Sequence, residues 1–508
     1  MTTRVARQHL VAVVAVAAAH LIGCGPGPEA PAVCPAPSAR ARDGVDPAHL
    51  LSFVVGDDVR VQGLSGAAPP GARVELGDAT LTADDAGAFD VVSSSAGASP
   101  TLAVDDVEIA LTPRRTDDAL ACAVSEPVST GTLPNDVVIV TCDGRVHAAV
   151  ALSAEGAIDV VDATGVRRDP RPVFAVEEGV GAQPFQLALV DEGPLAVVTL
   201  FAWHAVALVD LCAGRVLDTA RVVDDAGAPV RFAVDPPLTL PGPVDADLDG
   251  ASETVVARAV ALHPQALAVS GAGVVVAFTG HLWPATDDTD QILAPGVLAR
   301  FSVVDDALVL EGARAIEGAR NPQAVVALDD GFVVSLSGPF ARGGATAVAD
   351  DGAIAFVDDD GAPVRTLGAG RFAPARPAVV DGRLVVGSLL SPRIAIVEET
   401  AASLDDAVVV TVPGRAVSSL FDAAPLGGGL VVVTDFTEDR LHLVDAARGV
   451  ALSWPFVEGL PVAPASEVFR GALAVDVVGD APGRATAAVL LGLSSEVVFV
   501  DLAGVFGP

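Results

Sequence analysis

The chain has 508 residues and a lopsided charge, with 65 acidic residues against 30 lysines and arginines and a formal net charge of −35. All 30 of those basic residues are arginines, which excludes chemistry that needs a lysine ammonium, such as P-loop phosphate binding or Schiff-base catalysis. The acidic balance repels phosphate backbones, so no nucleic acid partner is expected.

Residues 1–23 predict an export signal. Arg4 and Arg7 form a short positive region, and the apolar run from Leu10 to Ala19 is too short for a permanent membrane span. The sequence Leu21-Ile22-Gly23-Cys24 resembles the bacterial lipobox. That resemblance implies cleavage before Cys24 and lipid on its sulfur; the alternative is an ordinary secretory signal with an incidental cysteine. By analogy with lipoproteins, Gly25 in place of Asp favours the outer membrane of the cell envelope.

The Pro/Ala-rich segment 24–48 predicts an extended tether, which at roughly 3.1 Å per residue reaches up to ~70 Å from the bilayer. If Cys24 carries lipid, the cysteines that remain are Cys34, Cys122, Cys142 and Cys212, which allow three pairings. We expect a disulfide between Cys122 and Cys142, which flank one connection; the alternative is buried free thiols. No cysteine spacing supports haem attachment or structural zinc.

Residues 49–115 alternate in short apolar runs separated by Gly, Asp and Pro, the pattern of a small β-sandwich. The segment from Gly71 to Val91 resembles bacterial Ig-like modules, which usually act as spacers. An Ig-like β-sandwich is therefore expected before the rest of the chain.

An internal repeat fills residues 118–508. An apolar run that ends in an acid recurs seven times, and a second Val-rich run precedes most copies. The seven copies are Ile158–Asp162, Ala207–Asp210, Phe301–Asp305, Ile354–Asp358, Ile394–Glu398, Leu441–Asp445 and Val497–Asp501. Strands at a period of about 40–50 residues indicate propeller blades.

The repeat resembles the YVTN type of β-propeller, most closely at 207–214 and 441–449. We therefore expect an all-β protein with a seven-bladed β-propeller. The long interval before Phe301 leaves an eighth blade open, although 226–258 supplies only two plausible strands. A strand from residues 119–129 is expected to complete the last blade and close the ring.

Three insertions, 226–258, 281–296 and 339–352, are predicted to lie on one face of the ring, because blade-to-blade loops and loops between second and third strands share a face. We expect this face to bind a protein or another ligand; the alternative is that the insertions have no role.

The first insertion contains Asp245-Ala-Asp247-Leu-Asp249-Gly250-Ala251-Ser-Glu253. Alternate carboxylates followed by a glycine favour a calcium site. The pattern resembles the calcium loops of integrin-type FG-GAP propellers, which implies side-chain ligands Asp245, Asp247, Asp249 and Glu253 and a carbonyl ligand at Ala251. One more acidic turn in an acidic chain is the alternative.

No residue is assigned a catalytic role. His204 and His442 lie on apolar strands and are expected in or near the core, whereas His281 opens an insertion rich in aspartate, where a second metal or a catalytic pair is the less favoured option. The leading interpretation is a non-catalytic, lipid-anchored envelope protein with a binding face. A lactonase-like propeller hydrolase and a purely structural envelope protein are the alternatives.

Overall fold

The computed structural model describes residues 41, 43–94, 100–166, 181–191, 193–244, 251, 253–282, 292–293, 295–337, 352–370, 372–413, 418–452, 456, 458–463 and 470–507. The expected signal peptide, Cys24 and most of the expected tether lie outside these residues. Within the described part of the chain, no helix is long and apolar enough to cross a membrane.

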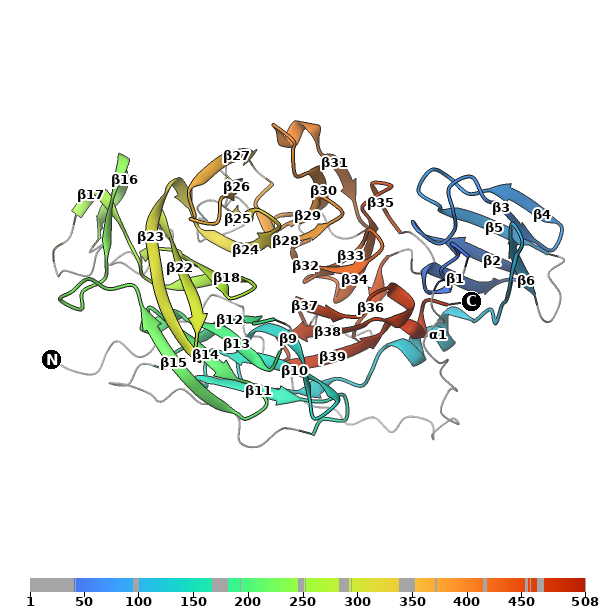
Figure 1. The fold of residues 1–508 in the computed structure, drawn as a ribbon, viewed down its shortest axis with the longest axis horizontal. Helices are drawn as coiled ribbons and strands as arrows, with labels where there is room; N and C mark the ends of the chain where they lie inside the picture. Colours follow the sequence, from blue (N-terminus) through green and yellow to red (C-terminus); the bar gives the residue numbers. More distant parts are fainter. Residues whose placement is uncertain are drawn as a thin grey trace.

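Residues 50–110 form a β-sandwich, here called the N-terminal module (Figure 1). One sheet has the order β1-β2-β5 and the other the order β4-β3-β6-β7. The strands are β1 (Leu50–Val55), β2 (Asp58–Gly63), β3 (Arg73–Leu76), β4 (Ala79–Thr82), β5 (Phe89–Ser93), β6 (Thr101–Val104) and β7 (Val107–Ala110). Alternating buried residues of both sheets share one core that includes Val61, Val74 and Val91. The β-sandwich is confirmed, whereas its Ig-like class stays a prediction.

Seven antiparallel sheets follow and form the seven-bladed β-propeller that the repeat predicted (Figure 1). Blades 1 to 3 contain β9 (Pro134–Cys142), β10 (Arg145–Leu152) and β11 (Ala157–Val161); β12 (Pro184–Leu189), β13 (Leu195–Leu200), β14 (Ala205–Asp210) and β15 (Arg215–Arg221); and β18 (Pro264–Ser270), β19 (Gly273–Phe278), β22 (Pro295–Val304) and β23 (Ala307–Arg320). Blades 4 and 5 contain β24 (Pro322–Leu328), β25 (Gly331–Leu336), β26 (Gly352–Val357) and β27 (Pro363–Gly370); and β28 (Pro374–Val380), β29 (Arg383–Ser388), β30 (Ser391–Glu398) and β31 (Val408–Thr411).

Blade 6 contains β32 (Leu420–Gly427), β33 (Leu430–Asp435), β34 (Arg440–Asp445) and β35 (Val450–Ala451), and β36 (Leu460–Pro461) also pairs with β34. Blade 7 contains β37 (Ala472–Val478), β38 (Thr486–Leu491), β39 (Glu496–Asp501) and β8 (Val128–Ser129). Each first strand contacts the first strands of the two adjacent blades, and β37 contacts β9, so the seven blades close into a ring.

Ring closure follows the sequence-based expectation in part. The strand β8 pairs with β39, with Val128 opposite Val497, and Val124 forms a bridge to Val500. The N-terminal portion of the expected closing strand is instead helical, because residues Thr116–Ala123 form α1. The last blade is therefore completed by chain that precedes the ring, and β8 covers the outer edge of β39.

No eighth blade is inserted between blades 2 and 3. Strands β12 and β18 contact one another directly, and the intervening chain forms a two-stranded hairpin of β16 (Arg231–Val244) and β17 (Glu253–Val260). The side chains of Val234 and Ala259 anchor this hairpin in the core shared by blades 2 and 3. The long interval in the repeat is thus an insertion within a seven-bladed ring.

The recurrent acids close the turns that follow the third strands. Asp162 Oδ1 accepts the backbone N–H groups of Thr164 and Val166, at 2.9 and 3.0 Å. Asp358 binds its turn in the same way through Asp360 and Ala362, at 3.0 and 2.7 Å. Aspartate is suited to this place because its short side chain can accept N–H groups two to four residues further along the chain.

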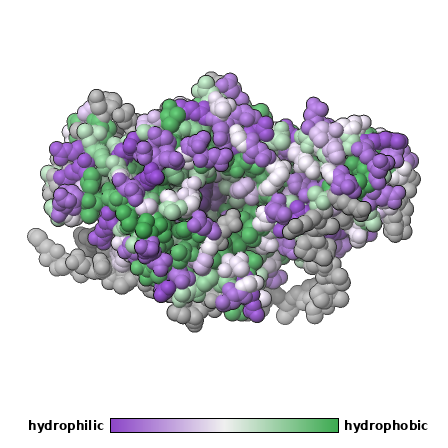
Figure 2. Space-filling model, in the orientation of Figure 1, coloured by the Kyte–Doolittle hydropathy of each residue, from purple (hydrophilic) through white to green (hydrophobic). Residues whose placement is uncertain are grey.

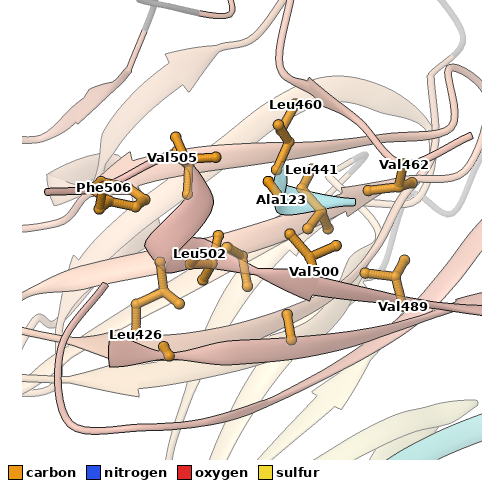
Figure 3. Close-up of a cluster of buried hydrophobic side chains, with 14 of the residues drawn as sticks. Ala123, Leu426, Leu441, Leu460, Val462, Val489, Val500, Leu502, Val505 and Phe506 are labelled. Carbon is orange, nitrogen blue, oxygen red and sulfur yellow. The ribbon is translucent and has the colours of Figure 1, made fainter. Parts of the chain in front are cut away.

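The N-terminal module packs against blades 6 and 7 rather than standing apart as a spacer. One continuous apolar cluster joins Leu51, Phe53 and Leu64 of the module to α1 and to both blades. Figure 3 shows the part of this cluster where Ala123 of α1 and Phe506 near the C-terminus meet blade residues such as Leu441. Leu51 also forms a parallel bridge with Gly507. These contacts make the module and the ring one packed unit.

Candidate functional site on the insertion face

The antiparallel blades divide the ring into two faces. Blade-to-blade loops and loops between second and third strands lie on one face, here called the insertion face; all other turns lie on the opposite face. The topology confirms that 226–258 joins blades 2 and 3 and that 281–296 joins β19 to β22. The segment 339–352 joins β25 to β26 but lies outside the described residues except for Gly352.

The N-terminal module contacts the opposite face. Ser65 binds Asp445 at the end of the third strand of blade 6, where the buried Ser65 hydroxyl lies 2.8 and 2.7 Å from the two carboxylate oxygens. Arg484, in the turn between β37 and β38, pairs with Asp46 at 3.1 Å. Both sites belong to turns of the opposite face. The module therefore leaves the insertion face uncovered.

A β-bulge recurs near the start of the first strand in every blade. The register skips the second residue of the strand, and in blades 2, 5 and 6 the third residue as well, at the insertion-face end of the channel. The seven skipped second residues are Asn135, Phe185, Gln265, Gln323, Ala375, Phe421 and Leu473. Gln265 and Gln323 hydrogen-bond across adjacent blades at 3.0 Å. All seven residues lie on the innermost strands at the insertion-face end of the channel; six of them are half-buried, and Ala375 is fully buried.

Two phenylalanine pairs occupy equivalent positions in blades 2 and 6. Phe185 packs on Phe201 with ring centroids 5.7 Å apart, and Phe421 packs on Phe436 with centroids 5.0 Å apart. In each pair one ring is the skipped second residue and the other directly follows the second strand. All four rings are only half-buried. Aromatic rings held in this manner offer rigid apolar area at low entropic cost.

A histidine pair extends the blade 2 cluster. The His263 ring lies 4.6 Å from Phe201 and 4.4 Å from His204, between ring centroids. His204 Nδ1 accepts the backbone N–H of His263 at 3.1 Å, which requires an unprotonated nitrogen. Burial, with a smaller contribution from Arg221, lowers the pKa of His204 to about 4. His204 is therefore a neutral packing residue at physiological pH.

The channel below the mouth holds charged side chains. Arg376, on the first strand of blade 5, lies 3.2 Å from Asp136 and 3.7 Å from Asp422, on blades 1 and 6. The space-filling view shows a hollow at the centre of the ring (Figure 2). The Arg376 side chain is 24% exposed, against 5% and 4% for the two aspartates. The guanidinium of blade 5 therefore contacts both the neighbouring blade 6 and blade 1, which is not its neighbour in the ring.

The channel carboxylates also link adjacent first strands. Asp136 accepts the backbone N–H of Leu187 at 2.8 Å, and Asp422 accepts that of Val475 at 3.0 Å. Asp476 accepts from Ile139 at 2.6 Å, and Gln186 from Leu267 at 2.6 Å. Each of these contacts joins one blade to the next. The polar side chains of the channel are thus part of the scaffold.

Burial dominates the titration of this cluster. It raises the pKa of Asp422 to about 7, against the opposing effect of Arg376, and it raises the pKa of Asp476 to about 6. The pKa of Asp136 is raised by the same cause. Burial alone would lower the pKa of Arg376, but the surrounding carboxylates outweigh it and raise that pKa. Arg376 therefore stays charged.

The expected disulfide between Cys122 and Cys142 is wrong. Cys142, at the end of β9, is bonded to Cys212, which follows β14 in blade 2, with a Cα–Cα distance of 5.5 Å. Cys122 lies on α1, which packs beside blade 7. It belongs to a different disulfide. Ring geometry brings the third-strand end of one blade next to the first-strand end of its neighbour, which proximity in sequence does not reveal.

The other singled-out residues are distributed as follows. Asp245, Asp247 and Asp249 lie outside the described residues; Ala251 is exposed, and Glu253 begins β17, so the strand expected after the calcium loop is confirmed. His442 is buried in β34, 3.3 Å from Asp435, as expected for a core residue. His281 begins the short strand β20 (His281–Leu282). Within the described residues, no three His, Cys, Asp or Glu side chains are grouped to hold a metal.

Sequence reasoning missed the two phenylalanine pairs. The signal is present, because Phe185 and Phe421 both follow the residue that begins a first strand, and Phe201 and Phe436 both follow a second strand. Superposing the repeats by strand phase would have aligned them. The channel cluster would have appeared in the same superposition, because Asp136, Arg376 and Asp422 are each the third residue of a first strand.

Neither a protein-family model nor a curated protein matches the sequence. Several solved structures are similar in fold. The virginiamycin B lyase of Staphylococcus aureus has a TM-score of 0.44 and 10% identity, covering 74% of this chain and 98% of its own. The WD40 repeats of RRP9 have a TM-score of 0.47 and 10% identity, covering 74% of this chain and 98% of their own. The hydrazine synthase of Kuenenia stuttgartiensis has a TM-score of 0.43 and 13% identity, covering 73% of this chain and 96% of its own.

Proposed function

We propose that this protein is a non-catalytic recognition module that binds a protein partner through its insertion face. The observation that carries the proposal is the pair of half-buried phenylalanine clusters at the mouth of the channel, on the face that the N-terminal module leaves uncovered. Rigid aromatic side chains in such settings supply much of the binding energy at protein interfaces. The net charge of −35 favours partners with a basic surface.

The channel supports recognition better than hydrolysis. A lactonase-like enzyme would need carboxylates that converge on a substrate or metal. Here Asp136, Asp422 and Asp476 each accept a backbone N–H of the next blade, and Arg376 lies against two of them. These hydrogen bonds account for the carboxylates as structural groups, and within the described residues no further observation favours the hydrolase.

Affinity capture from envelope extract tests the binding face. The bait is mature protein from Gly25, compared with the double variant Phe201→Ala/Phe436→Ala. The matched control is Val146→Ala, which removes a side chain that is 39% exposed on the opposite face. We expect one partner to be retained by the parent and by the control and lost by the double variant. Equal capture by all three folded baits, or no capture above background, would contradict the proposal.

We further propose that the protein is anchored in the cell envelope, in the outer membrane, through lipid on Cys24. The support is the lipobox-like sequence Leu21-Ile22-Gly23-Cys24 and the Pro-rich segment after it. Expression of the full chain in a Gram-negative host, followed by membrane fractionation, tests this. The wild type should sediment with outer membrane, with a diacylglyceryl mass on its N-terminal peptide. Cys24→Ser should remove both properties, and a wild type without lipid would overturn the anchor.

Calcium binding at the tip of the β16–β17 hairpin is a separate proposal. The alternating aspartates at 245, 247 and 249, Ala251 and Glu253 would hold the ion, and the chain continues as a strand as in such loops. Bound calcium would neutralise carboxylates that otherwise repel one another. The melting temperature of the wild type should rise in calcium relative to chelator, and that of Asp247→Ala should not respond. An identical response of the two proteins would reject the site.

A further inference from the structure

The cysteines of the chain leave one disulfide partner to be identified. The sequence contains five cysteines, and Cys142 is bonded to Cys212. Cys122 is disulfide-bonded as well, so within one chain its partner is Cys24 or Cys34. Both residues belong to the tether. We propose that Cys34 is the partner and that this bond staples the tether to the opposite face of the propeller.

The choice of Cys34 rests on the lipid anchor of the proposed function. A sulfur that carries diacylglycerol cannot form a disulfide, so lipidation of Cys24 leaves Cys34 alone as the partner. An exported protein also reaches an oxidising compartment in which such a bond persists.

The surroundings of Cys122 are open to an approaching chain. The half-buried Cys122 lines a cavity of about 310 Å³ beside α1. The remaining lining residues are Ala121, Ala123, Val124, Ser125, Val146, Ala163, Thr486, Phe499 and Asp501. Most of these side chains are small or apolar, as are those of Pro31-Ala32-Val33-Cys34-Pro35-Ala36-Pro37. The segment around Cys34 is therefore the occupant that we assign to this cavity.

The tether is long enough to reach the cavity. Asp46, near the beginning of the described chain, pairs with Arg484 at 3.1 Å. Thr486, only two residues after Arg484, lines the cavity. Twelve residues separate Cys34 from Asp46, and an extended Pro-rich chain of that length spans about 37 Å. Two residues span about 7 Å at most, so the staple requires no rearrangement of the fold.

The cavity lies on the opposite face of the ring. Val146 follows the turn between first and second strands in blade 1, and Thr486 follows the equivalent turn in blade 7. Asp501 ends the third strand of blade 7. With the staple in place, only the ten residues from Cys24 to Cys34, about 31 Å of extended chain, separate the lipid from the ring. The staple thereby directs the insertion face away from the membrane.

Tryptic release of the tether tests the staple. Mature protein with Cys24→Ser is folded under oxidising conditions and cleaved after Arg40 and Arg42. The fragment with Cys34 should stay attached until reductant is added. In Cys34→Ser, which alters only the tether, and in Cys122→Ser, it should leave without reductant. The double variant Cys142→Ser/Cys212→Ser is the control and should retain the fragment. Release from the Cys24→Ser parent protein without reductant would overturn the proposal.

The chemical states of Cys24 and Cys34 show whether the disulfide proposal or the lipid-anchor proposal has failed. Lipid on Cys24 together with a free thiol at Cys34 in membrane-extracted wild type would reject the staple alone. A Cys24–Cys122 disulfide would reject both assignments. For orientation, a headgroup photo-crosslinker in vesicles bearing the lipidated protein should label the opposite face near Val146, and this labelling should fall in Cys34→Ser. Equal labelling of both faces in wild type would overturn the orientation.

Discussion

Ser65 and Asp445 join the N-terminal module to blade 6 through a buried contact in which the hydroxyl of Ser65 lies 2.8 and 2.7 Å from the two carboxylate oxygens, and its backbone N–H donates to Oδ2 at 3.2 Å. Asp445 is also one of the recurrent strand-end acids, and it accepts the N–H of Arg448 at 3.1 Å. One residue of the repeat thus closes its own turn and holds the module.

Because of this double role, we expect the loss of Asp445 to lower the free energy of unfolding more than the loss of another strand-end acid of the repeat. Asp445→Ala leaves the donors of Ser65 buried without an acceptor and should lower the free energy of unfolding by about 1–3 kcal/mol. Asp210→Ala removes the equivalent acid in blade 2, whose carboxylate accepts the N–H of Ala213 at 2.9 Å, and should cost roughly 0.5–1 kcal/mol. Chemical denaturation of both variants gives the comparison. Equal losses would show that the module contact adds nothing.

Gly428 is a second test of the docked module. It lies in the turn between β32 and β33 with a φ of +60°, and an added Cβ would collide with the His49 ring. Gly271 occupies the same type of turn in blade 3, with a φ of +55° and nothing within 4 Å of an added Cβ. Both alanine variants carry the cost of a left-handed residue, about 1–2 kcal/mol.

Only Gly428→Ala should also displace the module, because His49 is buried and its Nδ1 hydrogen-bonds the Ser65 carbonyl at 2.7 Å. We expect a larger loss of melting temperature for Gly428→Ala, with faster hydrogen exchange in residues 46–67. A melting temperature equal to that of Gly271→Ala would mean that the module does not pack tightly against this turn.

The disulfide between Cys142 and Cys212 should stabilise the ring. It links blades 1 and 2 over a sequence separation of 70 residues, so its loss releases considerable entropy in the unfolded chain. Replacing both residues by serine should lower the free energy of unfolding by about 2–4 kcal/mol. Denaturation of the oxidised parent and of the double variant measures this. A non-reducing peptide map that joins Cys142 to Cys122 would contradict the pairing.

The buried channel carboxylates predict a pH dependence of stability. Burial raises the folded pKa of Asp422 to about 7 from a reference of 3.8, and that of Asp476 to about 6. A carboxyl with a raised folded pKa binds its proton more tightly in the folded state, so its effect is to lower stability as the pH rises from about 4 to 7. Asp422→Asn should flatten this slope.

The measurement is the urea midpoint of parent and variant across that interval. Val364→Ala, which shortens a side chain that is 66% exposed, serves as the control and should keep the parental slope. An unchanged slope in Asp422→Asn would show that Asp422 does not titrate in this window. The comparison between variants isolates Asp422 from the other titrating groups, including His204 with its lowered pKa.

The number of blades was predictable because the strand-end acids have a local physical role. Asp162 and Asp358 close turns within a few residues, and an aspartate recurs at all the equivalent positions except that of Glu398. The pairing of Cys142 with Cys212 was not predictable, since it depends on which strand ends meet across a blade boundary. The contact between Ser65 and Asp445 joins elements far apart in sequence and has no local signature. The phenylalanine pairs lie between these cases, visible only after the repeats are phased.

Closure of the ring by β8 sets an order on folding during synthesis. The chain emerges from its N-terminus, so Val128 is available long before its partner Val497. Blades 1 to 6 can each pair their own strands as they appear, but the ring cannot close until blade 7 has been synthesised. Until then the apolar faces of blades 1 and 7, which share a core that includes Ile139 and Val497, stay exposed, a state in which β-rich chains aggregate. The arrival of blade 7 therefore decides when these faces are protected from such association.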